Sequence, residues 1–301
     1  KTDLKGRAVR GGTVTLLAQG ARFILQVTST VTLARLLSPN DFGLIAMVTE
    51  ITNFALLFKD IGLSTATIQR AELNHAQVGT LFWINSVFGI TLAVLIVALA
   101  PLVGWFYGEP RLVPVMAILA LGFVFGGLTV QHQALLRRSM RFTALGLAEV
   151  FGMFLGVSVA IISAWFGAGY WALVFMQLAI PAGMLIGVWV VCPWRPGWPS
   201  RRSGVRSMLA FGRDIAGFQS VNYFSRNLDK ILIGRFWGGN ALGLYSRAYS
   251  LMMLPLSQIR QPLTSVALPA LSRLQDDPQR YRRAFLRTTE KILMLSLPPV
   301  T

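Results

Sequence analysis

The sequence is poor in the residues on which many enzymes and secreted domains depend. Among 301 residues there is one cysteine, Cys192, and there are two histidines, His75 and His132. A single cysteine excludes an internal disulfide framework, and this small set of ligand side chains predicts no metal centre. The chain also has no nucleophile motif, no paired histidine and carboxylate spacing and no glycine-rich phosphate loop. We therefore expect no catalytic residues, no cofactor and no enzymatic activity, ATP hydrolysis included.

Acidic residues are scarce too, with 12 Asp and Glu against 28 Lys and Arg, which gives a net charge of +16. Hydrophobic residues make up 54% of the chain, and the mean hydropathy is +0.57, far above that of a soluble domain. The basic residues lie in the loops between apolar runs and not in one patch with interleaved aromatic side chains. This pattern favours a multi-pass protein of the lipid bilayer and argues against nucleic acid as a partner.

Eight apolar runs are long enough to cross a bilayer, and a ninth opens near Lys291. Gly167 and Ala168 alone separate the fifth and sixth runs and predict a tight hairpin, whereas a polar segment at 64–79 precedes the third. Because the chain begins at Lys1 and stops inside the ninth run, we expect it to be part of a longer protein. The runs cover about residues 11–37, 41–63, 81–106, 112–136, 144–166, 169–191, 208–236 and 242–271.

The distribution of basic residues predicts the orientation. With the N-terminus in the cytoplasm, the loops and termini on the cytoplasmic side hold 17 Lys and Arg, whereas the opposite loops hold three, Arg35, Arg111 and Arg235. Cytoplasmic loops are the ones that carry excess Lys and Arg. We expect the N-terminus to be cytoplasmic.

The stretch at 12–44 returns 200 positions later, at 212–244. Six of the 33 aligned pairs are identical, namely Gly12 and Gly212, Gln19 and Gln219, Arg35 and Arg235, Asn40 and Asn240, Gly43 and Gly243, and Leu44 and Leu244. Six runs separate the two copies, so both copies cross in the same direction, which predicts a parallel repeat of two bundles. The predicted domains are a six-helix bundle at 1–191, a basic, proline-rich linker at 192–207 and the start of a second bundle at 208–301, with two full spans and part of a third.

Each copy of the repeat carries a stripe of side chains at helical spacing. In the first copy the stripe is Thr15, Gln19, Arg22, Gln26 and Ser29, and in the second it is Ile215, Gln219, Asn222, Arg226 and Asp229. A charged group near the middle of a span costs roughly 2.5–3.5 kcal/mol in lipid, so Arg22 should face a protein or water-filled interior. The alternative is a structural polar contact between packed helices.

Three segments of the sequence carry a resemblance to a known family. They are 33–43 (LARLLSPNDFG), 57–70 (LFKDIGLSTATIQR) and 131–138 (QHQALLRR). In these segments the chain resembles the polysaccharide-transport family of Wzx-type oligosaccharide flippases, within the multidrug/oligosaccharidyl-lipid/polysaccharide exporter superfamily. The resemblance implies an all-α polytopic transporter of two six-helix bundles around a central cavity, with the second bundle truncated here.

The resemblance also implies a substrate and a pathway. The substrate would be an undecaprenyl-diphosphate-linked oligosaccharide, moved to the outer leaflet for lipopolysaccharide O-antigen, capsule or exopolysaccharide synthesis, with a polysaccharide polymerase and other assembly proteins as partners. Arginine forks suit a diphosphate, which points to Arg22, Arg226 and Arg247. Sugar hydroxyls would be bound by amide side chains, and the candidates are Gln19, Gln26, Asn53, Asn85, Gln219 and Asn222.

Several roles stay open at this stage. Glu50 and Asp229 are candidates for proton or cation coupling, or are salt-bridge partners that hold the arginines. Lys59 and Asp60 are a candidate inner gate, or simply reach toward the membrane surface. Two rival functions remain. A cation-coupled antiporter of small molecules shares the superfamily fold, and a more acidic cavity is expected for it. A membrane-embedded sugar polymerase or ligase belongs to another class, and a large outer loop is expected for it.

Overall fold

The computed structural model describes residues 2–56, 75–139, 141–198, 221–253 and 286, with side chains from residue 17 onward. Within these ranges the chain forms helices and turns, and they contain no strand. The predicted all-α architecture is therefore confirmed. The helices are α1 (Thr2–Leu36), α2 (Pro39–Leu56), α4 (His75–Tyr107), α5 (Leu112–Leu119), α6 (Leu121–Arg138), α7 (Phe142–Trp165) and α8 (Trp171–Val191), and residues 221–253 are also helical.

Four described stretches are long and apolar enough to cross a membrane: Ala76–Tyr107, Leu112–Arg138, Phe142–Trp165 and Trp171–Val191. The second of them contains α5 and α6, which meet at Ala120, so the predicted fourth span consists of two helices and not one. Helix α4 begins at His75, so the last residues of the polar segment predicted at 64–79 are helical, and 64–74 lie outside the described residues. The multi-pass membrane character is confirmed.

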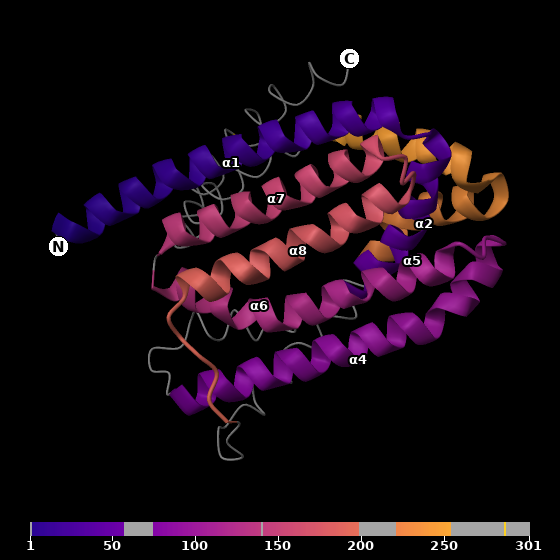
Figure 1. Cartoon of the computed structure of the whole chain (residues 1–301). Coiled ribbons are helices and arrows are strands. Elements are labelled where there is room, and N and C mark those ends of the chain that lie inside the picture. The colour runs from indigo at the N-terminus through magenta and orange to yellow at the C-terminus, as the bar shows by residue number, and fades with distance from the viewer. Residues whose placement is uncertain (1, 57–74, 140, 199–220, 254–285, 287–301) are drawn as a thin grey trace. The chain divides into compact units, whose positions relative to one another are not determined.

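The long helices lie side by side in the order α1, α7, α8, α6 and α4 (Figure 1). Small residues bring α7 and α8 close together. A methyl group on Gly152 would lie 2.8 Å from the carbonyl oxygen of Ile180, and one on Gly187 would lie 2.8 Å from the Cβ of Ala148. Such close approach between helix backbones is how helices associate in lipid, where burial of apolar surface no longer drives them together.

The helix ends have local causes in the sequence. Ser38 and Asp41 form a capping box at the start of α2: the Ser38 backbone N–H donates to Asp41 Oδ2 at 2.9 Å, and the Asp41 N–H donates to Ser38 Oγ at 3.3 Å. Pro39 at the first helical position has the required backbone angle. The hairpin predicted between α7 and α8 is confirmed, and Gly167 adopts a φ of 79° in it, which favours glycine.

The turn between α4 and α5 is closed by a charged pair. Arg111 donates to both carboxylate oxygens of Glu109, at 2.7 and 2.8 Å. These hydrogen bonds hold the pKa of Glu109 below its usual range. The pair lies between two apolar stretches and not within them, so its charges carry little desolvation cost.

The larger apolar core draws on all seven labelled helices, and it includes Leu33, Val48, Leu112 and Met116, each at most 1% exposed. Many large apolar side chains lie instead on the outside, as a lipid-facing surface requires. Trp105 and Trp165 are 79% and 77% exposed near helix ends, which is where membrane proteins concentrate tryptophan.

The chain divides into two compact units, Lys1–Gly243 and Leu244–Thr301. The second unit is described only at 244–253 and 286, so most of the predicted eighth span and the whole ninth lie outside the described residues. The same holds for 199–207 of the predicted linker. The division at 1–191, 192–207 and 208–301 stays a prediction.

Candidate functional site

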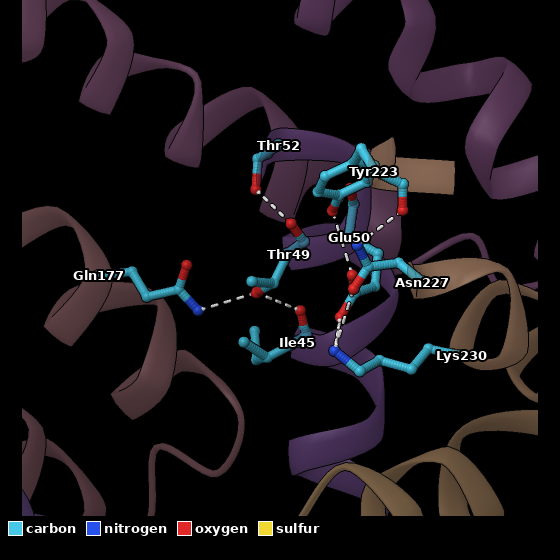
Figure 2. A network of polar contacts seen from close by, with 8 residues as sticks. All are labelled: Ile45, Thr49, Glu50, Thr52, Gln177, Tyr223, Asn227 and Lys230. Carbon is cyan, nitrogen blue, oxygen red and sulfur yellow. Dashed lines mark hydrogen bonds and ion pairs between the residues drawn. The ribbon is translucent and has the colours of Figure 1, made fainter. Parts of the chain in front are cut away.

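Glu50, near the middle of α2, is buried against the helix of the second repeat copy (Figure 2). Its Oε1 lies 2.9 Å from Nζ of Lys230, and the two side chains are 7% and 16% exposed. Tyr223 Oη donates to the backbone oxygen of Glu50 at 2.6 Å and lies 3.1 Å from its Oε2. Both carboxylate oxygens therefore have partners on the second copy.

The second copy presents these partners from one helix face. Lys230 Nζ also donates to Asn227 Oδ1 at 3.4 Å, and Asn227 Nδ2 donates to the backbone oxygen of Tyr223 at 2.9 Å. Positions 223, 227 and 230 are separated by four and three residues, so they share a face. Phe54 of α2 packs on Tyr223, with ring centroids 5.7 Å apart. The polar network thus has an aromatic wall.

The opposite side of α2 is tied to α8. Gln177 Nε2 donates to Thr49 Oγ1 at 3.2 Å, and that hydroxyl donates to the backbone oxygen of Ile45 at 2.7 Å (Figure 2). Thr52 Oγ1 likewise donates to the Val48 oxygen, at 3.1 Å. Helix α2 is therefore fixed to the first bundle on one side and to the second repeat copy on the other.

The depth of the pair decides its energetics. Glu50 comes eleven positions after Pro39, the first residue of α2, which at 1.5 Å per residue is about 16 Å along the helix. The hydrocarbon core is about 30 Å thick, so the span predicted at 41–63, which is not among the four stretches given above, would place the carboxylate near its middle. Removing one partner of such a buried pair typically costs about 3–5 kcal/mol, because the other charge is left without compensation.

The two repeat copies also touch through glycines at equivalent positions. Gly43 lies against the carbonyl oxygen of Gly239, and Gly243 lies against the carbonyl oxygen of Pro39. The repeat relates the two contacts, because Gly43 is equivalent to Gly243 and Gly239 is equivalent to Pro39. Reciprocal contacts of this kind are what a two-fold relation between the copies produces, whereas the parallel direction of the two copies stays a prediction.

Two residues of the first copy's polar stripe, Arg22 and Ser29, contact helices of the same unit. Arg22 Nη1 lies 2.7 Å from Glu149 Oε2 on α7, and the two side chains are 39% and 26% exposed. Ser29 is buried, with its Oγ 3.5 Å from Met176 Sδ on α8. The predicted diphosphate ligand Arg22 thus has an anionic partner already.

The other predicted site residues are scattered. Gln19 is half-buried on α1, Asn85 is buried where α4 meets α6, and Arg247 is half-buried in the second unit. The exposed ones are Gln26, Asn53, Asn222, Arg226 and Asp229. Gln219, Lys59 and Asp60 lie outside the described residues. The binding, coupling and gating roles of all these residues stay predictions.

Sequence reasoning missed Lys230, Tyr223, Asn227 and Glu149. Glu50 was given as a coupling residue or as the partner of an arginine, but its cationic partner is a lysine. The face of the second copy that contacts α2 is one position further along the chain than the predicted stripe. The spacing of 223, 227 and 230 was a visible signal for it, although no local pattern connects that face to Glu50.

Comparison with known proteins places the chain in a family. The pattern of the family described as polysaccharide biosynthesis protein matches residues 32–301. The teichuronic acid biosynthesis protein TuaB of Bacillus subtilis is 30% identical over 277 residues, covering 91% of this chain and 57% of TuaB. The lipopolysaccharide biosynthesis protein WzxC of Escherichia coli is 26% identical over 298 residues, covering 98% of this chain and 61% of WzxC.

A third relative, the succinoglycan biosynthesis transport protein ExoT of Rhizobium meliloti, is 23% identical over 285 residues, covering 94% of this chain and 57% of ExoT. The chain thus spans about three fifths of the length of these relatives. No solved structure matches it. Since the family pattern extends over nearly the whole sequence, the chain belongs to the polysaccharide biosynthesis family of membrane proteins, as its resemblance to Wzx-type flippases predicted.

Proposed function

We propose that the protein moves an undecaprenyl-diphosphate-linked oligosaccharide from the cytoplasmic to the outer leaflet of a bacterial inner membrane. The product would enter surface polysaccharide synthesis, and the N-terminus would be cytoplasmic. The names of the relatives support the pathway, since they include teichuronic acid and lipopolysaccharide biosynthesis and succinoglycan biosynthesis transport. The protein would be a transporter and not an enzyme, and a polysaccharide polymerase would use its product.

The observation that carries the proposal is the buried pair of Glu50 and Lys230 between the two repeat copies. A protein that only anchors others in the membrane has no need for a charged contact inside the bilayer, because apolar side chains hold helices together at lower cost. A transporter that alternates between two arrangements does need contacts that can separate. A polar pair can exchange its partner for water or for a substrate group when the copies move apart.

The substrate chemistry suits the cations that the two repeat copies carry. A diphosphate must cross about 30 Å of hydrocarbon and needs groups that replace its hydration. Arg22 and Arg226 lie on the two repeat copies and would bind its oxygens with their planar forks. Arg22 would exchange Glu149 for the diphosphate, so Glu149 holds the guanidinium in place until the substrate arrives.

A genetic test distinguishes this function from its rivals. In the source bacterium, deletion of the gene should abolish surface polysaccharide and cause lipid-linked repeat units to accumulate on the cytoplasmic side. The intact gene product should restore both, and a variant with Glu50→Gln should restore clearly less. Accumulation of undecaprenyl-linked single repeat units at the outer leaflet would instead indicate a polymerase. Normal polysaccharide together with a loss of resistance to cationic dyes would indicate a small-molecule antiporter.

A further inference from the structure

We infer that the ion pair of Glu50 and Lys230 is a latch that an anion releases. The pair holds the two repeat copies together at their glycine contact until a phosphate group replaces Glu50 as the partner of Lys230. The inference rests on the proposed function for the lipid part of the ligand. The latch itself follows from the contacts of α2 with the second copy.

The first step concerns the position of the pair. Gly43 and Gly239 touch at the start of α2, and Glu50 lies two turns further along the same helix. The glycines allow backbone contact and form no bond that has to break when the copies separate. The ion pair and its tyrosine are therefore the strong contacts on this part of the interface.

The second step concerns what happens when the copies separate. Lys230 and Tyr223 both belong to the second copy, so they leave Glu50 together. Separation would take the carboxylate away from the buried ammonium group of Lys230, so opening is rare unless another anion replaces it. A diphosphate offers several negatively charged acceptor oxygens close together, with which an ammonium group forms charge-assisted hydrogen bonds.

The third step concerns the companions of Lys230. Asn227 accepts from its Nζ and so keeps the ammonium group aligned within its own helix. Because this contact stays within one helix, it survives the separation of the copies. Lys230 would therefore be presented to an incoming anion in a fixed position and would not fold back to the membrane surface.

The test reads closure directly and needs no transport. Met47 is 3% exposed, and its Cγ lies 3.4 Å from the position of a methyl group on Gly234 of the second copy. In purified intact protein with Cys192→Ala, a cysteine at Met47 reacts with N-ethylmaleimide only when water reaches it, because the reactive species is the thiolate. Its labelling rate therefore reports opening.

Glu50→Gln and Lys230→Met should each raise the labelling rate about tenfold or more, since each removes one charge of the buried ion pair between the copies. The exchange of both charges, Glu50→Lys with Lys230→Glu, should bring the rate back to within about threefold of the parent, as expected when a pair is restored. Arg35→Gln, which removes an exposed cation outside the network, serves as the matched control and should leave the rate unchanged. Equal rates in the parent and both single variants would overturn the latch, as would an exchanged pair that labels as fast as the single variants.

The ligand is tested with three additions. Undecaprenyl diphosphate should speed labelling of the parent several-fold, and undecaprenol, which lacks the anion, should not. Inorganic pyrophosphate shows whether the anion acts without its lipid. Neither anion should affect the neutral double variant Glu50→Gln with Lys230→Met, which has no charges to separate.

An unchanged rate in the parent with both anions would overturn the release step. Because these probes carry no sugar, this result is independent of the proposed function. Labelling that responds to undecaprenyl diphosphate, together with no movement of the lipid-linked oligosaccharide, would remove that function and leave the latch in place.

Discussion

Alanine in place of Gly43 is expected to reduce surface polysaccharide at least about tenfold at normal expression. The added methyl group would overlap the carbonyl oxygen of Gly239, which belongs to the backbone and has no rotamer with which to move away. Overpacking of a tight interior contact typically costs about 1–3 kcal/mol, and a backbone neighbour gives the upper end of that range. Gly243→Ala should have an effect of similar size, because its methyl group meets the carbonyl oxygen of Pro39 in the reciprocal contact.

Gly122→Ala provides the control for this pair. Gly122 lies within α6 with no atom within 4 Å of the position of the added methyl group, so the change should be neutral or slightly stabilising. The measurement is polysaccharide output together with the thermal unfolding of the detergent-purified protein. If Gly43→Ala behaves like Gly122→Ala in both assays, the two repeat copies do not meet at these glycines in the working protein.

Arg22→Ala and Arg226→Ala are each expected to weaken substrate binding on the order of tenfold or more, because each removes a charge-assisted contact with the diphosphate worth very roughly 1.5–3 kcal/mol. Lysine at either position should rescue transport only in part, since its ammonium group lacks the bidentate fork. Surface polysaccharide at normal expression and binding of lipid-linked oligosaccharide to the purified protein are the measurements.

Glu149 separates a binding role of Arg22 from a structural one. If Arg22 serves only to neutralise Glu149, the double variant Arg22→Ala with Glu149→Gln should recover most of the lost activity, because no unpaired charge remains. If Arg22 binds the diphosphate, the double variant should stay as impaired as Arg22→Ala alone. Full activity with glutamine at Arg22 or at Arg226 would remove that residue from the proposed site.

Much of the architecture follows from local properties of the sequence. Hydropathy marked the four described stretches that can cross a membrane, and the short connection at Gly167 and Ala168 predicted the hairpin that the structure contains. Ser38, Pro39 and Asp41 form a local sequence pattern that marks the start of a helix, with capping side chains at Ser38 and Asp41 and proline at the first helical position. The break at Ala120 was missed because the run from Leu112 stays apolar throughout and contains no turn signal at that point.

The candidate site was harder to predict, because it depends on helical phase and on pairs far apart in the chain. Adjacent residues on a helix point about 100° apart, so an error of one position moves the polar face away from its partner. The stripe through Arg226 and Asp229 therefore misses the face of Lys230 that binds Glu50. The partners of Arg22 and Glu50 are separated from them by 127 and 180 positions, and residue spacing does not report such contacts.

The repeat connects the architecture with the candidate site. A weak similarity between 12–44 and 212–244 predicted that the copies are equivalent, and the reciprocal glycine contacts support this equivalence in space. The glycines at 43 and 243 were visible as identities in the repeat, although their role as contact points required the fold. Identities between weak repeats therefore indicate where the two copies meet as well as which turns they share.

The proposed function is tested most directly by watching the substrate cross a membrane. The purified intact protein is reconstituted into vesicles that contain lipid-linked oligosaccharide with a fluorescent sugar, and a membrane-impermeant quencher added outside reports the share in the outer leaflet. With the protein, the quencher should come to reach nearly all of the lipid-linked oligosaccharide that can exchange between the leaflets. In protein-free vesicles and in vesicles with Glu50→Gln, the accessible fraction should rise clearly more slowly. Fluorescence that stays in two leaflet pools with the parent protein, while a cationic dye crosses the same vesicles, would contradict the account.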